Sequence, residues 1–303
     1  MLGKAGYGMD VQTLDAETLD EEMPAEETLD DIERITSGLD SSVKQRENRF
    51  PADETVSIED FQHPEESFPD WDERLIKVVG FSNRTAESFR VLRSKILLPQ
   101  DGRPAPKSIM VTSALPQEGK TFVTANLGIA LAQGVDQHAL LVDCDLRAPS
   151  LAQLFGISSE HGLANYLQGN NDLASLLRRT SSMKLSILAS GLPPVNPAEL
   201  LGSARMQNLV EELSNRYPDR YVIFDTPPLE VASESKVLSQ AVDAVVLVVR
   251  QGTSSRTLVE KFISDIGKDR IIGVIFNGYK TNFISTRLID KSHYYYGNYY
   301  KNN

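Results

Sequence analysis

The sequence has very little cysteine: Cys144 is the one cysteine among 303 residues. A single cysteine excludes a disulfide framework within the chain and any metal site built from several cysteines. Aromatic residues make up 7% of the chain, and no apolar run approaches the length of about 18 residues that suggests a membrane-spanning helix. The first residues are acidic and do not resemble a signal peptide. We therefore expect a cytoplasmic protein without a membrane-spanning helix.

Basic residues are scarce in the first quarter of the chain. Residues 1–73 hold 22 acidic and 5 basic residues, a balance of −17, whereas the other 230 residues hold 20 acidic and 26 basic residues, a balance of +6. We expect residues 1–75 to form an acidic, mostly disordered extension, because they combine high charge with few aromatic residues. The mildly basic remainder suits a domain that handles phosphates, and we expect no nucleic-acid partner.

Apolar runs and amphipathic runs alternate along the rest of the chain. Strands are predicted at residues 108–112, 139–145, 185–189, 221–225, 242–249 and 271–277, and helices at 85–98, 122–132, 196–217 and 255–266. Residues 146–183 suggest short helices and turns. Strands that are nearly all apolar, with helices between them, predict an α/β fold with a parallel sheet covered by helices on both faces.

The stretch Ala114–Thr121, which reads ALPQEGKT, lies between a predicted strand and a predicted helix. This is the context that a phosphate-binding loop requires. Backbone N–H groups at a helix N-terminus are unpaired and lie at the positive end of the helix dipole. Gly119 allows a close approach of the phosphates, Lys120 can reach the β- and γ-phosphates, and the Thr121 hydroxyl can ligate Mg²⁺. Ala114 stands where the motif usually has its first glycine.

Carboxylates end two of the predicted strands. Asp143 and Asp145 close the second strand, and on an ideal strand they would share one face. Asp225 closes a later apolar strand, as the metal-holding aspartate of a Walker B element does. Ligands of open α/β sheets bind at the carboxyl ends of the strands. We therefore expect these carboxylates beside the phosphate loop.

The chain ends in a tyrosine-rich segment. Five of its ten tyrosines fall within seven residues: Tyr294, Tyr295, Tyr296, Tyr299 and Tyr300. Such aromatic-polar tails are typical of flexible segments. Beside a nucleotide site, the tail would offer five phenolic phosphoacceptors on a tether.

In these features the sequence resembles the bacterial tyrosine kinases of exopolysaccharide and capsule loci, most closely the split, soluble type that works with a separate membrane co-polymerase. The similarity spans residues 80–303. Its motifs are the loop Ser113–Thr121, the stretch Leu141–Pro149 as second Walker motif, Val222–Pro228 as Walker B, the tyrosine tail, and the spacing Glu87-x-x-Arg90-x-x-Arg93 of the family's subunit-contact helix. The resemblance implies a deviant P-loop NTPase fold with a kinase domain at 76–284 and a tail at 285–303.

The resemblance also implies roles for individual residues, with ATP and Mg²⁺ as cofactors. Lys120, Asp143 and Asp145 would be catalytic, Asp143 as the base or orienter of the tyrosine hydroxyl. Thr121, Asp145 and Asp225 would hold Mg²⁺. The nucleotide would contact Pro116, Gln117, Glu118, Gly119, Lys120, Thr121, Phe122 and, at the adenine, Asn277.

For the whole protein, the resemblance implies an autokinase that phosphorylates its own tail in trans and regulates exopolysaccharide synthesis. Glu87, Arg90 and Arg93 would join subunits in a ring. The implied partners are a membrane co-polymerase, which recruits the protein to the inner face of the plasma membrane, and a tyrosine phosphatase. The other interpretation is that Glu87, Arg90 and Arg93 form an ordinary solvent-exposed face of the helix, without a role in subunit contact.

The main alternative is an ATPase of the partitioning or cell-division-site type, which uses the same fold as a dimerisation switch. That class usually carries a second lysine just after the first glycine of the loop, where this chain has Leu115. Iron–sulfur carriers of this fold need cysteine pairs, which Cys144 alone cannot supply. A catalytically idle scaffold is disfavoured, because Lys120 and all three carboxylates are present.

Overall fold

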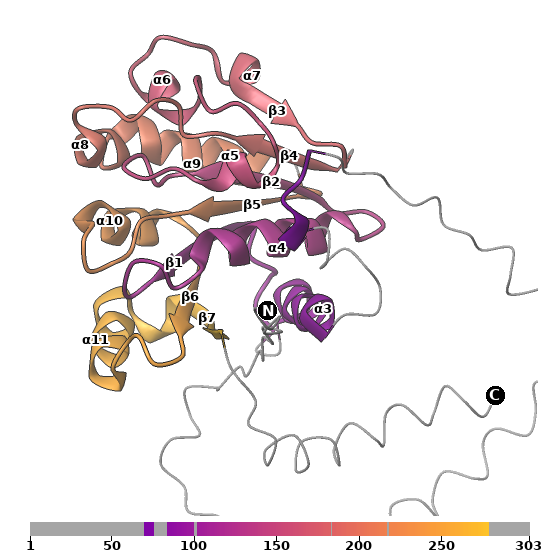
Figure 1. Ribbon diagram of the computed structural model, residues 1–303, viewed down its shortest axis with the longest axis vertical. Helices are drawn as coiled ribbons and strands as arrows, with labels where there is room; N and C mark the ends of the chain where they lie inside the picture. The colour runs from indigo at the N-terminus through magenta and orange to yellow at the C-terminus, as the bar shows by residue number, and fades with distance from the viewer. Residues whose placement is uncertain (1–69, 76–83, 100–101, 183, 217, 279–303) are drawn as a thin grey trace, which may run out of the picture. The chain divides into compact units, whose positions relative to one another are not determined.

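The computed structural model describes residues 70–75, 84–99, 102–182, 184–216 and 218–278, and these build a seven-stranded sheet in the order β3-β4-β2-β5-β1-β6-β7 (Figure 1). The strands are β1 (Ser108–Ser113), β2 (His138–Asp143), β3 (Leu177–Arg179), β4 (Leu185–Leu188), β5 (Arg220–Asp225), β6 (Ala244–Arg250) and β7 (Ile271–Asn277). Neighbouring strands are parallel except β3, which runs antiparallel to β4. The expected α/β fold with a mostly parallel sheet is confirmed.

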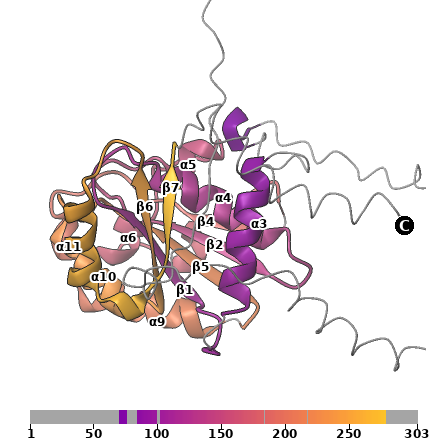
Figure 2. The ribbon, with the colours of Figure 1, turned by 90° about the horizontal axis from the view of Figure 1, so that it is seen from below.

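Helices cover both faces of the sheet, as Figure 2 shows from below. One face carries α3 (Arg84–Leu97), α4 (Lys120–Ala132) and α5 (Leu151–Leu154). The other carries α6 (Leu163–Leu167), α7 (Leu173–Leu176), α8 (Pro197–Leu201), α9 (Ala204–Arg216), α10 (Ser233–Ala241) and α11 (Arg256–Ile266), and a 3₁₀ turn, η2 (Lys268–Arg270), precedes β7. None of these helices in the described ranges is long and apolar enough to cross a membrane.

Successive side chains of each strand point to opposite faces of the sheet, and this alternation divides the core into two layers. In β1, Ile109 and Val111 pack in the layer of α3 and α4, whereas Met110 packs in the layer of the later helices. All six residues of β1 are buried, because helices cover both faces. This burial explains why the strands are continuous apolar runs rather than alternating ones. The order of the sheet also places β5 beside β1, which leads into the phosphate loop, and β2 on the other side of β5.

Three local predictions from the sequence were wrong. The helix predicted over 196–217 is broken at Gly202, and Ser203 starts α9 by accepting a hydrogen bond from the Met206 N–H. The antiparallel edge strand β3 was missed, because its three residues are too few for a periodic signal. β2 ends at Asp143, so Asp145 lies in the following loop and does not share a strand face with it.

A short segment before α3 belongs to the same core as the sheet. Trp71 and Leu75 are buried among residues of α3, α4 and α5, although we assigned them to the acidic extension on composition. The Trp71 ring meets the Phe155 ring edge-on, with the ring centroids 5.0 Å apart. The Asp72 N–H donates a hydrogen bond to the Leu154 carbonyl, at 2.8 Å. These contacts fix residues 70–75 against α5.

Candidate functional site

The loop between β1 and α4 is shaped by two residues with positive φ. Gly119, at φ 94°, is the N-cap of α4, and Gln117 has φ 62°. A Cβ at Gly119 would lie 1.9 Å from the Asn277 side-chain nitrogen. Glycine is therefore required at this position for conformation and for space. The result is a loop that presents the N-terminus of α4 to the carboxyl edge of the sheet.

Buried hydrogen bonds hold this loop on the side away from the carboxyl-edge cavity. The Glu118 side chain is fully buried, and its carboxylate accepts hydrogen bonds from Leu115 N, Arg250 N and the Ser254 hydroxyl, at 2.9, 3.1 and 2.7 Å. The Asn277 amide donates to the Glu118 carbonyl at 2.8 Å. Glu118 and Asn277 thus fasten the loop to the ends of β6 and β7, and neither lines the cavity in front of it.

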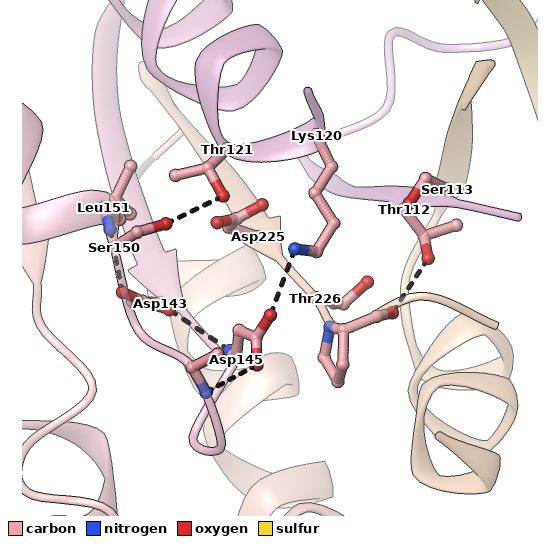
Figure 3. Close-up of polar contacts among 12 residues, drawn as sticks. Thr112, Ser113, Lys120, Thr121, Asp143, Asp145, Ser150, Leu151, Asp225 and Thr226 are labelled. Carbon is pink, nitrogen blue, oxygen red and sulfur yellow. Dashed lines mark hydrogen bonds and ion pairs between the residues drawn. The ribbon is translucent and has the colours of Figure 1, made fainter. Parts of the chain in front are cut away.

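That cavity has a volume of about 650 Å³. It is lined by Asp72, Arg74, Pro116, Gln117, Gly119, Lys120, Thr121, Phe122, Asp145, Arg147, Ala148, Ser150, Gln153, Leu154, Pro227, Pro228 and Val231. Lys120 Nζ lies 3.0 Å from the Asp145 carboxylate, and both side chains are largely buried (Figure 3). The Asp145 carboxylate therefore neutralises the charge of the loop lysine. All loop residues that we predicted to bind nucleotide, except Glu118, line this cavity.

Asp225 lies at the base of the site, fully buried at the end of β5. Burial raises the pKa of Asp225 to about 6, against the opposing effects of the Lys120 charge and the nearby Thr121 hydroxyl. The Thr124 hydroxyl contacts Asp225 Oδ1 at 3.3 Å, while Oδ2 is buried without a hydrogen bond of normal geometry from the described residues. A buried oxygen without a partner is costly unless something binds it.

Asp143 is also fully buried, and both its oxygens accept backbone hydrogen bonds at 3.1 Å, from Asp145 N and from Leu151 N. Burial, and then the neighbouring charge of Asp225, raise the pKa of Asp143 well above its ordinary value. Asp143 lines a second cavity, of about 410 Å³, which shares Ser150 and Gln153 with the first. The two cavities therefore adjoin at α5.

The residues present fit a magnesium ion. Mg²⁺ prefers hard oxygen ligands and is usually bound by one or two carboxylates together with substrate phosphates. Asp225 Oδ2 offers a buried acceptor close to Thr121, and Thr121 and Asp145 line the first cavity, which Asp225 itself does not line. In the part of the chain that the structure describes, no three His, Cys, Asp or Glu side chains form a metal cage by themselves.

Several residues of the site were given no role in the sequence analysis. The Ser150 hydroxyl donates to the Thr121 hydroxyl at 3.2 Å. Arg147 lines the cavity and pairs with the buried Glu234, at 2.9 Å, at the start of α10. Arg74 reaches the cavity from the segment before α3. Pairing between residues 87 positions apart leaves no local pattern, which is why Glu234 was missed.

The two arginines of α3, the helix expected to join subunits, make different contacts. Arg90 pairs with Glu87 on the exposed side of α3. Arg93 instead donates to the Ala130 carbonyl in the last turn of α4, at 2.9 Å, so it supports packing within the chain. The five tail tyrosines lie outside the described residues.

Comparisons with known proteins agree with this geometry. Residues 109–296 match the model of the CobQ/CobB/MinD/ParA nucleotide-binding domain. Tyrosine-protein kinase YwqD of Bacillus subtilis is 34% identical over 197 residues, which cover 64% of this chain and 81% of YwqD. Tyrosine-protein kinase etk of Escherichia coli K12 is 36% identical over 172 residues, which cover 56% of this chain but 23% of that longer protein.

Two solved structures are similar in fold and sequence. The kinase domain of Escherichia coli tyrosine kinase ETK superposes with a TM-score of 0.61 and 31% identity, covering 69% of this chain and 83% of that domain. The chimerical protein CapA2B2 superposes with a TM-score of 0.62 and 30% identity, covering 69% and 92% of the two chains.

Proposed function

The chain belongs to the bacterial tyrosine kinases, within the CobQ/CobB/MinD/ParA nucleotide-binding family, and we propose that it is an ATP-dependent protein-tyrosine autokinase. The observation that carries the proposal is the meeting of Lys120, Asp145 and Asp225 at the carboxyl ends of three neighbouring strands, around the phosphate loop. Phosphoryl transfer depends mainly on positioning and on neutralising charge, which this arrangement supplies.

Nucleotide binding would change the partner of Lys120. The N-terminal N–H groups of α4 and the Lys120 ammonium both suit phosphate oxygens. The Lys120 ammonium pairs with Asp145, and a triphosphate would bring several negative charges to the same place. Lys120 would then move to the phosphates and release Asp145. A magnesium ion held at Thr121, Asp145 and Asp225 would neutralise phosphate charge when bound.

Asp143 would serve the acceptor tyrosine. A phenol has a pKa near 10, so it keeps its proton until late in the transfer. A buried carboxylate whose pKa is raised accepts a proton more readily than an ordinary aspartate. The second cavity gives Asp143 its own approach beside α5, separate from the phosphate loop. We assign the larger cavity to the nucleotide and the smaller one to the acceptor.

On the scale of the cell, we propose that the kinase regulates exopolysaccharide synthesis together with a membrane co-polymerase, and that a tyrosine phosphatase resets it. The support is the similarity to tyrosine kinases and to the CapA2B2 chimera. The proposed phosphoacceptors are Tyr294, Tyr295, Tyr296, Tyr299 and Tyr300, reached in trans within a ring of subunits.

The test is mass spectrometry of the purified protein after incubation with ATP and Mg²⁺. We expect phosphate on tail tyrosines of the wild type and none on a Lys120→Met protein, because Lys120 is the cation of the loop. Lys236→Met is the matched control, since Lys236 pairs with Asp265 outside the site, at 2.7 Å. ATP hydrolysis without tyrosine phosphorylation, or an unchanged signal in Lys120→Met, would contradict the proposal.

A further inference from the structure

Residues 70–75 bring a cation to the larger cavity from outside the matched family domain, which begins at residue 109. The segment is held by the Trp71–Phe155 ring contact and by the hydrogen bond from Asp72 N to Leu154. Leu75 is fully buried. A Cβ at Gly156 would lie 2.4 Å from the Asp70 carbonyl oxygen, so the two backbones are in close contact. The position of the segment beside α5 is therefore set by packing.

Arg74 is oriented within this segment by Asp72. Its Nε and Nη2 atoms donate to the two Asp72 carboxylate oxygens at 2.8 and 2.9 Å, and the Arg74 N–H donates to the same carboxylate. This fork uses two of the five guanidinium N–H groups, so three remain for a further acceptor. The side chain is 61% exposed and lines the cavity. Asp72 thus holds a guanidinium at the cavity wall.

The position of Arg74 relative to α5 indicates which part of the cavity it serves. Asp72 binds the Leu154 carbonyl at the end of α5, and the first residue of α5 donates its N–H to Asp143. Gln153 of α5 lines both cavities. No residue of β6 or β7 is among those that line the larger cavity. Arg74 therefore approaches the cavity from the end of α5, the helix whose Gln153 lines both cavities.

Two other cations line this cavity, and each already has a buried or partly buried carboxylate partner from a distant segment. Lys120 pairs with Asp145, and Arg147 pairs with Glu234. Arg74 differs, because its partner is two residues away and 29% exposed. Guanidinium groups bind phosphate oxygens through paired, charge-assisted hydrogen bonds. A phosphate group between the two cavities would meet that geometry.

We propose that Arg74 is a further substrate-binding residue, which binds a phosphate dianion where the two cavities adjoin. The proposal rests on the proposed phosphoryl transfer and names a residue for it that lies outside the family's motifs. The phosphate is either the γ-phosphate of the nucleotide or the phosphate of a phosphotyrosine product, and the chemistry of recognition is the same for both. Asp72 orients the guanidinium, and the Trp71–Phe155 contact sets its distance from the phosphate loop.

The test compares Arg74→Ala and Arg74→Lys with wild type, in the full chain with Mg²⁺. The first arm measures affinity for ADP and for a non-hydrolysable ATP analogue by calorimetry. The second arm measures affinity of the ADP-bound protein for a phosphotyrosine peptide with the sequence of residues 291–303. Arg216→Ala is the matched control, because Arg216 is similarly exposed and pairs with Glu212 on α9, away from the cavity. Melting curves show that each variant is folded.

Loss of about tenfold or more in affinity for the ATP analogue, with ADP unchanged, identifies the γ-phosphate as the partner of Arg74. A similar loss for the phosphopeptide, with both nucleotides unchanged, identifies the phosphotyrosine. In either case Arg74→Lys should restore part of the affinity and Trp71→Ala should lower it, since that change releases the segment. Unchanged affinities for all three ligands in a folded Arg74→Ala protein would overturn the proposal. Both arms measure binding, and neither depends on kinase activity. A wild-type protein without kinase activity would refute the proposed function, while the affinities would still test the role of Arg74.

Discussion

The buried carboxylates of the site have different surroundings, and these suggest different roles. Asp145 pairs with Lys120 at the cavity, Asp225 has a buried oxygen without a hydrogen bond from the described residues, and Asp143 has both oxygens on backbone N–H groups. We propose that Asp145 and Asp225 exchange partners when phosphate and metal bind. Asp143 is arranged to stay in place while its proton is gained or lost.

Asp143→Asn should therefore lower the rate of tyrosine phosphorylation by about 10²-fold or more, with less than a threefold change in ATP affinity. The asparagine keeps one acceptor oxygen but cannot take the phenol proton, and the loop N–H groups supply nucleotide binding. Calorimetry and a single-turnover assay measure the two quantities. An equal loss of affinity and rate would make Asp143 a nucleotide-binding residue instead.

The pKa of Asp225 predicts how stability depends on pH without metal and nucleotide. The folded protein holds this proton more tightly than the unfolded chain, because burial raises the pKa from 3.8 to about 6. The associated stability is complete below pH 3.8 and is lost as the pH rises through 6. The free energy of unfolding should fall by up to roughly 3 kcal/mol over this range.

Urea unfolding in EDTA at several pH values measures this dependence. Asp225→Asn should have a flatter profile between pH 4 and pH 6, since the amide carries no proton to lose. The difference between the two profiles reports Asp225 together with its effect on Asp143, whose pKa the Asp225 charge raises. Parallel profiles would show that Asp225 is not protonated in the folded protein.

At the scale of elements, the phosphate loop depends on the ends of β6 and β7. Glu118 accepts hydrogen bonds from Leu115 N, Arg250 N and Ser254, and the Arg250 side chain donates to the Gln117 carbonyl at 3.1 Å. Asn277 binds the Glu118 carbonyl and fills the space that Gly119 leaves open. The shape of the loop therefore needs contacts to β6 and β7, two strands that come much later in the sequence.

Glu118→Gln should raise the KM for ATP by about tenfold, although the side chain does not line the nucleotide cavity. A glutamine has one acceptor oxygen, so its NH₂ group must face either Leu115 N or Arg250 N, and that donor loses its partner. Ser254→Ala is the milder comparison, because both backbone donors keep the carboxylate. Steady-state kinetics gives KM and kcat, and unchanged kinetics for Glu118→Gln would contradict the positioning role.

At the scale of the whole molecule, two properties can be predicted: self-assembly and its dependence on the charge of the tail. The structure separates the two arginines of α3: Arg90 lies on the exposed side with Glu87, and Arg93 supports α4 within the chain. We predict that Arg90→Glu weakens self-assembly in light scattering without lowering thermal stability. Arg93→Glu should lower stability as well, since it removes a contact to Ala130. An unchanged particle size for Arg90→Glu would show that the face with Arg90 and Glu87 is exposed to solvent and does not join subunits.

Phosphorylation of the tail should also dissolve the assembly. Each phosphate adds about −1.5 to −2 charges at pH 7, so five on residues 294–300 add roughly −7.5 to −10. Such a tail would be repelled by nucleotide phosphates and by Asp143, Asp145 and Asp225 of a neighbouring site. Particle sizes of unphosphorylated Lys120→Met and fully phosphorylated wild type, at equal concentration and salt, measure this. Equal sizes would show that tail charge does not control assembly.

The sequence by itself determined six of the seven described strands, the phosphate loop, and the places of Asp143 and Asp225 at strand ends. Apolar runs report strands because both faces are buried, and the loop motif is readable because its residues are adjacent in the chain. Only the tertiary structure decided that Glu118 does not line the larger cavity, that Asn277 supports the loop, and that Arg74 reaches the cavity. These roles come from contacts between distant segments, such as Glu118 and Ser254 at a separation of 136 residues, and a local pattern cannot encode them.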